Sequence, residues 1–377
     1  MTTIDTARLQ ASWTTVARYG DQVPLFFYAT LFVTHPDIRD MFPLGMATQR
    51  DKLVSALARV VSSVDDLPAI VPLVEQLGRD HRRFAVRPEH FPAVGEALLA
   101  TLEHFLGDGW NAGLAAEWAA AYELVAGTMQ MAAEADAHQP PWYDAVVAGV
   151  DRRTAGVAVL RVAPALTVPY RAGQSLALET EACPRMWRYY SPATLADQAG
   201  RFDLHVRAVG GGPVSTALVH ATRPGDALRL GAPVGEGLTL DGGCADLVLI
   251  AGGTGLAPLK ALVHHVDAAG GRRRVTLVWG GRRRPDLYDL PALEALCRHD
   301  WFDLVLCLSD EAPAEGRIRH GTAVGVALDH GDLAGRDVYV CGSPGMVAGT
   351  LAALRAAGVP AARVHHERFG SEEGTGG

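Results

Sequence analysis

The sequence predicts a multidomain protein: an all-α domain, then a small antiparallel β-barrel domain, then an α/β domain with a parallel sheet. Three observations predict this order. Residues 1–138 carry apolar side chains at helical spacing, with few strand signals. Residues 139–241 contain short strand-like runs divided by glycine and proline, which is typical of small barrels. Residues 242–377 alternate apolar strand runs with helical segments, as βαβ units do.

Length, composition and charge set the outer limits. The chain has 377 residues, which at roughly 150 residues per domain indicates two or three domains. Its 34 basic and 42 acidic residues give a net charge of −8, so we expect no nucleic-acid partner and no membrane partner. No apolar run reaches the roughly 18 residues of a membrane span, and the N-terminus lacks the pattern of a secretory signal. No obligate protein partner is evident.

The cysteines indicate the redox environment. The chain has five, an odd number, and they are dispersed and free of CxxC pairs. We therefore expect neither a disulfide framework nor a cysteine-based zinc or iron–sulfur site. A reducing cytoplasm is the expected location.

The first domain is expected to be helical throughout. Asp5 or Thr6 can cap its first helix, and the Pro-Pro pair at 140–141 predicts an extended linker after its last one. Apolar residues recur at helical spacing at Leu53, Leu57, Val60 and Val61, and again at Val94, Leu98, Leu99 and Leu102. We expect breaks between helices at Pro36, Pro43, Pro68, Pro72, Pro88 and Pro92.

Short strand-like runs mark the strands of the other two domains. In the second domain they cover residues 157–162 and 202–207. In the third they cover residues 247–250, 275–279, 304–308 and 338–340, with a helix expected at 259–267.

A glycine turn follows the first strand of the third domain. Residues 251–258 read Ala-Gly-Gly-Thr-Gly-Leu-Ala-Pro and open the next helix. At such a place, backbone N–H groups and the helix dipole can receive a pyrophosphate. Gly252, Gly253 and Gly255 allow close approach and positive φ angles. The turn lacks the third glycine of the Rossmann fingerprint, and by itself it is weaker evidence for nucleotide binding than for a plain tight turn.

Four further motifs give the turn a context. They are Arg188-Tyr-Tyr-Ser191, Gly211-Gly-Pro-Val-Ser215, Cys341-Gly-Ser-Pro-Gly-Met346 and Glu367-Arg-Phe-Gly370. In this order and spacing they resemble the ferredoxin–NADP reductase superfamily. The resemblance implies that the second domain binds FAD and the third binds NADH or NADPH.

The resemblance also implies roles for individual residues. Arg188 would pair with the FAD pyrophosphate, since a planar guanidinium suits phosphate. Tyr190 would pack against the isoalloxazine, and Ser191 would hydrogen-bond near the flavin N5. The remaining residues fall into three groups: Gly211, Gly212 and Ser215 on the pyrophosphate; Gly252, Gly253, Thr254, Gly255, Cys341 and Gly342 around the nicotinamide coenzyme; Glu367 and Phe369 beside the flavin edge.

Coenzyme preference rests on residues 280–288, Gly-Gly-Arg-Arg-Arg-Pro-Asp-Leu-Tyr, which follow the second strand of the third domain. Their three arginines could meet the 2′-phosphate of NADPH, whereas Asp286 could accept from the free 2′-hydroxyl of NADH. A solvated turn is an equally good reading. The Asp-Leu-Tyr-Asp-Leu run resembles NADH-using reductases of oxygenase systems and favours NADH, with NADPH possible.

The helical domain contains a candidate metal ligand, His81. A lone histidine is more often a surface residue than a ligand, and this domain also has His35, His90 and His104. The context of His81 is what singles it out. It comprises His35-Pro36, Met41-Phe42-Pro43, Gln49–Leu53, Asp66–Pro72 and Trp118–Tyr122.

This set of motifs resembles the globin domain of flavohaemoglobins. The resemblance implies that His81 is the proximal ligand of haem b and that Phe42 is wedged against the porphyrin. Tyr28 and Gln49 would be the distal pair that hydrogen-bonds the bound gas and slows its release. Leu53, one helical turn after Gln49, would crowd the iron.

The chain departs from the family on the proximal side. Flavohaemoglobins usually have a Tyr and a Glu there, and here those positions align with Phe91 and Ala135. We therefore expect the hydrogen-bond partner of His81 to be missing. The pattern resembles a divergent flavohaemoglobin subgroup for which another electron donor, such as D-lactate, has been proposed.

Together the resemblances imply a flavohaemoprotein oxidoreductase. Electrons would pass from NADH through FAD to haem iron, and nitric oxide would be oxidised to nitrate with O2, so that O2 and nitric oxide are the expected small ligands. Two alternatives stay open. One is an oxidoreductase on the same scaffold with another donor, and the other is a globin that binds or senses gas and is kept reduced by its own reductase.

Overall fold

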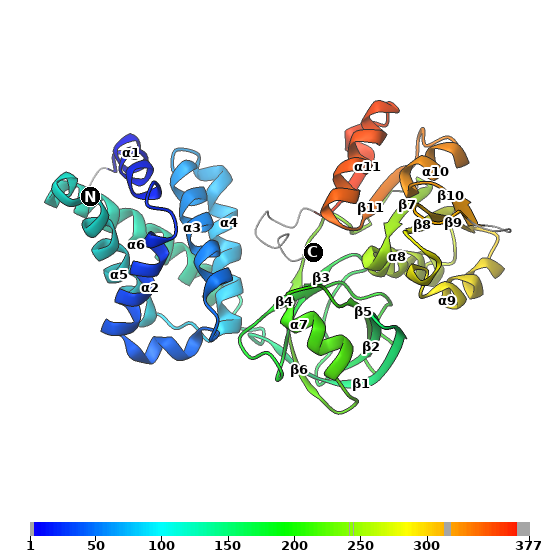
Figure 1. Ribbon diagram of the computed structural model, residues 1–377, viewed down its shortest axis with the longest axis horizontal. Helices are drawn as coiled ribbons and strands as arrows, with labels where there is room; N and C mark the ends of the chain where they lie inside the picture. Colours follow the sequence, from blue (N-terminus) through cyan, green and yellow to red (C-terminus); the bar gives the residue numbers. More distant parts are fainter. Residues whose placement is uncertain (1–3, 241, 244, 313–317, 368–377) are drawn as a thin grey trace. The chain divides into compact units, whose positions relative to one another are not determined.

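A computed structural model describes residues 4–240, 242–243, 245–312 and 318–367. The chain divides into two compact units, Met1–Trp142 and Tyr143–Gly377 (Figure 1). The described part of the first unit is helical, as predicted. Its α-helices are α1 (Thr6–Ala17), α2 (Gln22–Thr34), α3 (Ala47–Ser62), α4 (Leu67–His81), α5 (His90–Leu106) and α6 (Ala112–Ala135).

Side-chain caps fix two of these helix starts. The carboxylate of Asp5 accepts a hydrogen bond from the Arg8 backbone N–H at 3.1 Å and caps α1. Asn111 caps α6 in the same way, because its side-chain oxygen accepts from the N–H groups of Gly113 and Leu114. Such caps satisfy backbone donors that have no partner within the helix.

Not every proline of the first unit interrupts a helix. Pro68 and Pro92 lie in the first turns of α4 and α5, where a missing N–H costs little. Pro72, however, lies in the interior of α4, so the helix break predicted there is wrong. Buried Ile70 and Val74 flank it, and their burial keeps this face of the helix in the core despite the lost hydrogen bond.

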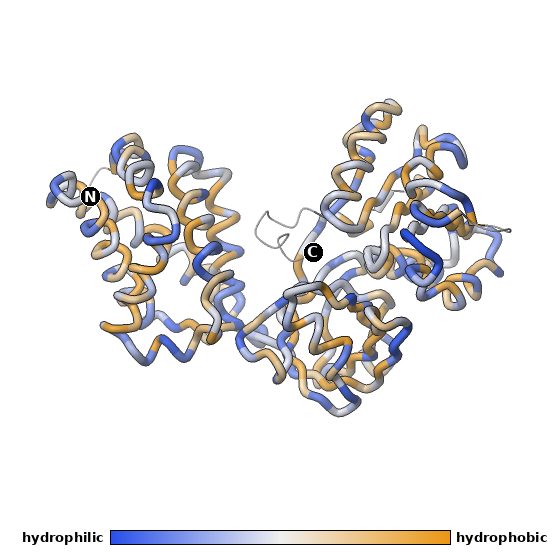
Figure 2. The backbone as a smooth tube through the Cα atoms, viewed as in Figure 1, coloured by the Kyte–Doolittle hydropathy of each residue, from blue (hydrophilic) through white to orange (hydrophobic). Residues whose placement is uncertain are grey.

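The core of the first unit is formed by the inner faces of the helices. Figure 2 shows hydrophobic and hydrophilic residues alternating along them, as in amphipathic helices. Fully buried members include Val16, Leu31 and Leu102. A smaller cluster, built on Ile70, Val74 and Met129, joins α4 to α6.

The second unit begins with an antiparallel six-stranded sheet. Its strands are β1 (Tyr143–Thr154), β2 (Val157–Pro164), β3 (Ser175–Thr180), β4 (Arg188–Tyr190), β5 (Phe202–Arg207) and β6 (Ala227–Val234), in the order β4-β3-β6-β1-β2-β5. An antiparallel bridge between Pro192 and Leu204 joins the end of β4 to β5, so the two edge strands meet and the sheet closes. The predicted barrel is confirmed. A short helix, α7 (Pro213–Thr216), follows β5.

A parallel six-stranded sheet follows, as predicted for βαβ units. Its strands are β7 (Leu247–Gly252), β8 (Val275–Gly281), β9 (Phe302–Leu308), β10 (Ile318–His320), β11 (Asp337–Cys341) and β12 (Val364–His366), in the order β10-β9-β8-β7-β11-β12. The helices around it are α8 (Leu256–Ala268), α9 (Leu290–Glu294), α10 (Ala323–His330) and α11 (Pro344–Ala356). The sequence missed the three-residue edge strands β10 and β12.

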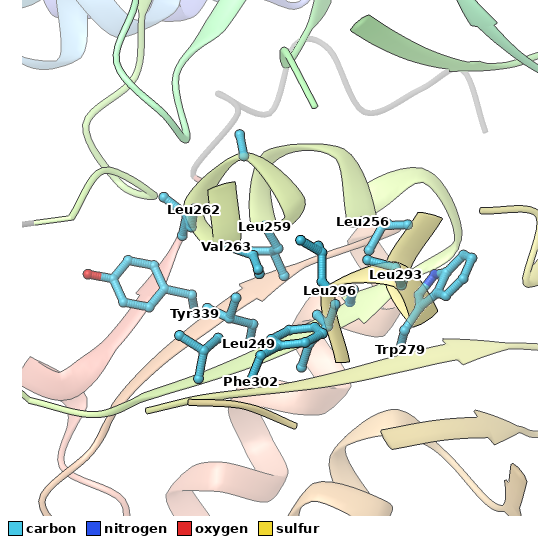
Figure 3. Packing of buried hydrophobic residues seen from close by; sticks show 14 of the residues in the cluster. Leu249, Leu256, Leu259, Leu262, Val263, Trp279, Leu293, Leu296, Phe302 and Tyr339 are labelled. Carbon is cyan, nitrogen blue, oxygen red and sulfur yellow. The ribbon is translucent and has the colours of Figure 1, made fainter. Parts of the chain in front are cut away.

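One apolar core joins the two sheets of the second unit. Figure 3 shows Leu249, Leu256, Leu259 and Trp279 packed between α8 and the parallel sheet. The same cluster contains Val157 from β2. The FAD-type and NAD-type domains therefore share buried surface, and each also has a buried cluster of its own.

No helix in the described residues is long and apolar enough to cross a membrane. Among the described cysteines, Cys183, Cys307 and Cys341 are free thiols. The predicted domain boundaries after residues 138 and 241 stay predictions.

Candidate functional site

A cavity of about 380 Å³ lies inside the helical unit. Its lining is mostly aliphatic and aromatic, with contributions from α1 to α6. The polar side chains at its wall include Tyr28, Gln49, His81, His90 and Tyr122. The structure thus brings five predicted residues together around one space: Tyr28, Phe42, Gln49, Leu53 and His81.

His81 ends α4 and lies at the cavity wall. Its Nδ1 is 2.7 Å from the carbonyl oxygen of Leu77, one turn earlier. Burial lowers the pKa of His81, and the carbonyl contact only partly opposes this. The imidazole is therefore neutral at pH 7, with Nδ1–H donating to Leu77 and Nε2 as the nitrogen able to bind a metal.

The expectation that His81 lacks a partner is wrong in one respect. The side chain of Phe91 packs with Val74 and Met129 and offers no polar atom, and Ala135 is the exposed last residue of α6. The backbone of α4 supplies the acceptor instead. An aligned side chain cannot reveal such a contact, because every helix has a carbonyl four residues back.

Tyr122 is a functional residue that sequence reasoning left without a role. Its hydroxyl donates to the carbonyl oxygen of Phe91 at 2.6 Å, and burial raises its pKa above the usual range. The phenol therefore ties α6 to the start of α5 beside the cavity. Its place four residues after Trp118 was the available signal.

The cavity wall also carries Tyr28 and Gln49. The Tyr28 hydroxyl donates to the backbone carbonyl of Gln49 at 3.4 Å, a long and weak hydrogen bond. Burial raises the pKa of Tyr28 to about 12, although the Gln49 side chain lowers it slightly. The phenol stays protonated at pH 7 and can turn its O–H toward a ligand. Phe42 packs edge-on against Tyr28, with ring centroids 5.5 Å apart.

These residues fit a haem. A large apolar cavity can bury a porphyrin, and a single neutral histidine with its Nδ1 held can bind the iron through Nε2. The protonated Tyr28 supplies a hydrogen-bond donor within the same cavity.

In the second unit, the predicted flavin motif lies on β4 and just beyond it. Arg188 donates from Nη1 to the Trp187 carbonyl at 2.8 Å, and burial raises the pKa of Tyr190 above its usual range. The Ser191 hydroxyl lies 2.8 Å from that of Ser175 on β3. Ser175 in turn donates to Glu367 Oε1 at 2.9 Å.

Ser175 is thus a second residue that sequence reasoning missed. It is fully buried, and it connects Ser191 with Glu367, which lies 192 positions later in the chain. Since Ser175 gives its proton to the carboxylate, Ser191 donates to Ser175. A serine directly before the apolar run at 176–178 was the available signal. The other flavin-edge residue, Phe369, lies outside the described residues.

The 211–215 segment forms a tight turn. Gly211 has a φ of +75°, and a Cβ at Gly212 would lie 2.5 Å from a methyl group of Val209. The Ser215 hydroxyl donates to the Gly212 carbonyl at 3.1 Å and accepts from the Val209 N–H at 3.2 Å. Both glycines are therefore required by the turn, and Ser215 holds it closed.

The two predicted coenzyme turns meet at one edge of the parallel sheet. β7 and β11 are neighbouring parallel strands, so Gly252 and Cys341 end them side by side. A Cβ on Gly255 would lie 2.4 Å from the Cys341 carbonyl oxygen, and one on Gly342 would lie 2.6 Å from the Met346 sulfur. Gly253 has a φ of +53°, so the chain turns sharply before α8, and Thr254 lies within that turn.

This edge is where ligands bind in open parallel sheets. Burial raises the pKa of the Cys341 thiol, and the Glu367 carboxylate raises it further. The thiol is therefore neutral at pH 7. Cys341 and Glu367 place the predicted coenzyme and flavin positions in one neighbourhood.

Asp286 has a structural role in the loop after β8. Its Oδ2 accepts from the backbone N–H groups of Arg282 and Arg283 at 3.0 and 3.1 Å, and its Oδ1 accepts from Arg207 at 3.2 Å. Burial opposes ionisation, but these donors together lower the pKa of Asp286. The carboxylate is ionised, and the arginines at 282–284 are exposed.

Comparison with protein families matches all three regions. Residues 25–129 match the globin family, residues 154–237 the oxidoreductase FAD-binding domain and residues 249–351 the oxidoreductase NAD-binding domain. The regions occur in the order that the sequence predicts.

Full-length relatives share this arrangement. The chain is 28% identical to a flavohemoprotein of Deinococcus radiodurans over 97% of this chain and 96% of that one. It is 23% identical to a flavohemoprotein of Bacillus subtilis, over 94% of each chain.

A solved structure shows the same fold. The flavohemoglobin of Malassezia yamatoensis, which contains FAD and haem, matches with a TM-score of 0.76 and 18% identity, over 97% of this chain and 98% of that one. The chain therefore has the domain arrangement of flavohemoproteins, a globin followed by FAD-binding and NAD-binding oxidoreductase domains, and it is similar to them over nearly its whole length.

Proposed function

We propose that this protein oxidises nitric oxide to nitrate with O2, using electrons that pass from NADH through FAD to haem b. The observation that carries the proposal is the pairing of His81, held through Nδ1, with the protonated Tyr28 in one apolar cavity. When bound, haem supplies the iron that binds O2, and FAD converts a two-electron donor into single electrons.

On the proximal side, His81 would hold the iron through Nε2. Its hydrogen bond to Leu77 keeps the Nδ1–H tautomer and the ring orientation. A carbonyl is a weaker acceptor than a carboxylate, so this imidazole is less basic than one paired with Glu. The apolar neighbours Phe91 and Val74 exclude water from this side.

On the distal side, Tyr28 and Gln49 would orient the gas. A phenol O–H that remains protonated donates a hydrogen bond to the ligand, and Gln49 can donate from its amide. Phe42 and Leu53 would exclude water and narrow the space beside the iron.

In the reductase, the glycine turn at 252–255 and the turn at 341–342 would hold NADH against the flavin. Arg188, Tyr190 and the turn held by Ser215 would bind FAD. The ionised Asp286 favours NADH, because a carboxylate repels the 2′-phosphate of NADPH. Free thiols at Cys183 and Cys307 fit the reducing cytoplasm that we propose as the location.

Two measurements on the purified holoprotein test the proposal. A haem Soret band and flavin absorption should both be present, and anaerobic NADH should bleach the flavin. The oxygenated, reduced protein should then convert nitric oxide to nitrate with one nitrate formed per nitric oxide. A reaction no faster than that of free haem would contradict the proposal and leave a protein that binds or senses gas.

A second candidate is an oxidoreductase with another donor, such as D-lactate. It is favoured by Phe91 and Ala135 in place of the proximal Tyr and Glu of the family. We propose the divergent subgroup on this ground. Flavin bleaching by D-lactate in the absence of NADH would support this candidate, whereas bleaching by NADH alone would support the first.

A further inference from the structure

A buried cluster of charged groups lies where the antiparallel and parallel sheets of the second unit meet. At its centre, Asp289 is fully buried between β8 and α9. Arg153 and His205 approach it from β1 and β5, whereas Lys260 approaches it from α8. We call these four residues the Asp289 cluster. The residues proposed to bind FAD, haem or NADH do not include any of them.

The charges of the cluster come from both domains. Lys260 Nζ lies 2.5 Å from Asp289 Oδ2 and belongs to the same domain. Arg153 Nη2, from the flavin domain, lies 3.6 Å from Asp289 Oδ1. A buried carboxylate needs nearby cations, because moving it out of water is costly. Any separation of the two domains would therefore remove a charge partner from Asp289.

His205 adds a hydrogen bond of defined geometry to this contact between the two domains. Its side chain is fully buried, and its Nε2 lies 3.9 Å from Asp289 Oδ2. Burial lowers its pKa well below the usual value, and the cations Lys260 and Arg153 and the nearby His264 lower it further, so the ring is neutral. The carboxylate favours the proton on Nε2. Nδ1 is then an acceptor and receives the Tyr288 O–H at 2.8 Å.

From Tyr288 the contacts continue to the proposed coenzyme turn. The Tyr288 ring packs edge-on against Trp279, with centroids 5.5 Å apart and planes at 90°. Trp279 Nε1 donates to the carbonyl oxygen of Gly253 at 3.1 Å. Gly253 has a positive φ and forms the turn between β7 and α8.

We propose that the Asp289 cluster, acting through Tyr288 and Trp279, fixes the position of the glycine turn of the NAD domain relative to the flavin domain. His205 is the link on the flavin side, and the Gly253 carbonyl is the point that is held. The cluster does not touch the coenzyme. It determines where the bound coenzyme lies relative to the flavin, and this inference rests on the NADH-to-FAD half of the proposed function.

Directed polar contacts suit such a role better than apolar ones. The apolar core that joins Val157 to Leu256 and Trp279 stabilises the interface without fixing one arrangement. The hydrogen bond between His205 and Tyr288 forms in only one relative position of the two domains, because its distance and angle are restricted. Buried ion pairs add little net stability, but they can specify a unique geometry.

The test uses the full-length protein loaded with haem and FAD. The variant Tyr288→Phe removes the hydroxyl and keeps the ring contact with Trp279. Tyr170→Phe is the control, since the half-buried Tyr170 also donates a phenol hydrogen bond to a backbone carbonyl, that of Thr194, but within the flavin domain alone. The readouts are the limiting rate of anaerobic FAD reduction by NADH, the dissociation constant of NADH, and hydrogen exchange of the 253–256 amides without coenzyme.

We expect Tyr288→Phe to lower the limiting rate about 10-fold to 100-fold, the effect of a displacement on the order of 1 Å. The dissociation constant should change less than about twofold, because binding needs only the NAD domain, and the 253–256 amides should exchange faster. The double variant His205→Gln/Tyr288→Phe should lose no more than the worse single variant, since both break one link.

The proposal is overturned if Tyr288→Phe leaves the rate and the exchange unchanged, or if Tyr170→Phe lowers the rate equally. A weaker affinity for NADH in Tyr288→Phe, in proportion to the loss in the limiting rate of FAD reduction, would overturn it as well. If wild-type FAD is reduced by neither NADH nor NADPH, the proposed function fails instead. The exchange measurement then still tests whether Tyr288 holds the turn.

Discussion

The imidazole of His81 is held by the carbonyl of Leu77, at 2.7 Å from Nδ1, and not by another side chain. The acceptor belongs to the same helix, α4, so this hydrogen bond can form whenever the helix is intact. The orientation of this proposed ligand ring is therefore coupled to the last turn of α4.

Replacing His81 by alanine should abolish haem binding. His81 is the proposed iron ligand, and the remaining cavity wall is largely apolar. The variant expressed with ample haem should lack the Soret band and retain flavin absorption. His104→Ala is the control, because His104 stacks on Phe26 and is exposed. An unchanged Soret band in His81→Ala would refute the haem assignment.

Tyr28→Phe should release O2 faster. Removing a hydrogen bond to a polar ligand costs about 1.5–3 kcal/mol, which corresponds to roughly a 10-fold to 150-fold higher dissociation rate constant. Stopped-flow mixing of the oxygenated protein with carbon monoxide measures this rate. Tyr19→Phe, at an exposed tyrosine, should leave it unchanged. A dissociation rate below twice that of wild type would exclude Tyr28 as a donor to the gas.

Alkaline pH should destabilise the helical unit through Tyr28. Its pKa is raised by burial from 10.0 to about 12 in the folded state. Above pH 10 the unfolded chain therefore binds fewer protons than the folded one, and the free energy of unfolding falls as pH rises. The contribution of Tyr28 is fully present below pH 10 and amounts to on the order of 2 kcal/mol. In Tyr28→Phe, denaturant unfolding of the helical unit should lose part of its dependence on pH between 10 and 12. An identical pH profile would contradict this.

Gly255→Ala should block FAD reduction and leave the globin intact. A Cβ there would lie 2.4 Å from the Cys341 carbonyl, so one of the two turns must move. We expect anaerobic reduction by NADH to slow at least about tenfold, with an unchanged Soret band. Gly349→Ala, inside α11 with open space around it, is the matched control and should raise stability by about 0.5–1 kcal/mol. Equal rates in both variants would refute the turn as the coenzyme site.

Coenzyme preference should depend on Asp286. Wild-type protein should be reduced faster by NADH than by NADPH. Asp286→Asn removes the negative charge, so we expect the NADH:NADPH ratio of kcat/KM to fall about tenfold, equivalent to about 1.4 kcal/mol. Asp310→Asn, on the exposed segment after β9, controls for net charge. A wild-type preference for NADPH would contradict this role of Asp286 and indicate instead that the exposed arginines at 282–284 bind the 2′-phosphate.

The sequence predicts the architecture well, because each domain has its own periodicity. Strand β8, for example, is predicted by residues 275–279, which are all apolar except Thr276, and no tertiary contact is needed to identify it. Pro72 shows the limit of such local rules. A proline was read as a break, whereas burial of Ile70 and Val74 on either side keeps the helix continuous.

The candidate site could be predicted only where the type of side chain itself indicates a role. Tyr28, Gln49, Phe42 and His81 line one cavity as the resemblance implied. The carbonyl of Leu77 and the hydroxyl of Ser175 were missed for two different reasons. The first is a backbone atom, which no residue type reports, and the second bridges two motifs that are far apart in the chain. Individual ligand roles stay predictions.

The backbone of His366 and Glu367 lies so close to the flavin domain that a Cβ on Gly237 would meet the His366 carbonyl at 2.4 Å, and one on Gly235 would meet the Glu367 carboxylate. The flavin domain is consequently completed by residues that follow the entire nucleotide domain. Cutting the gene near residue 241 would not yield an autonomous flavoprotein. Swapping this reductase onto another haem protein should be done at the 142–143 junction, with the segment through Glu367 carried along intact.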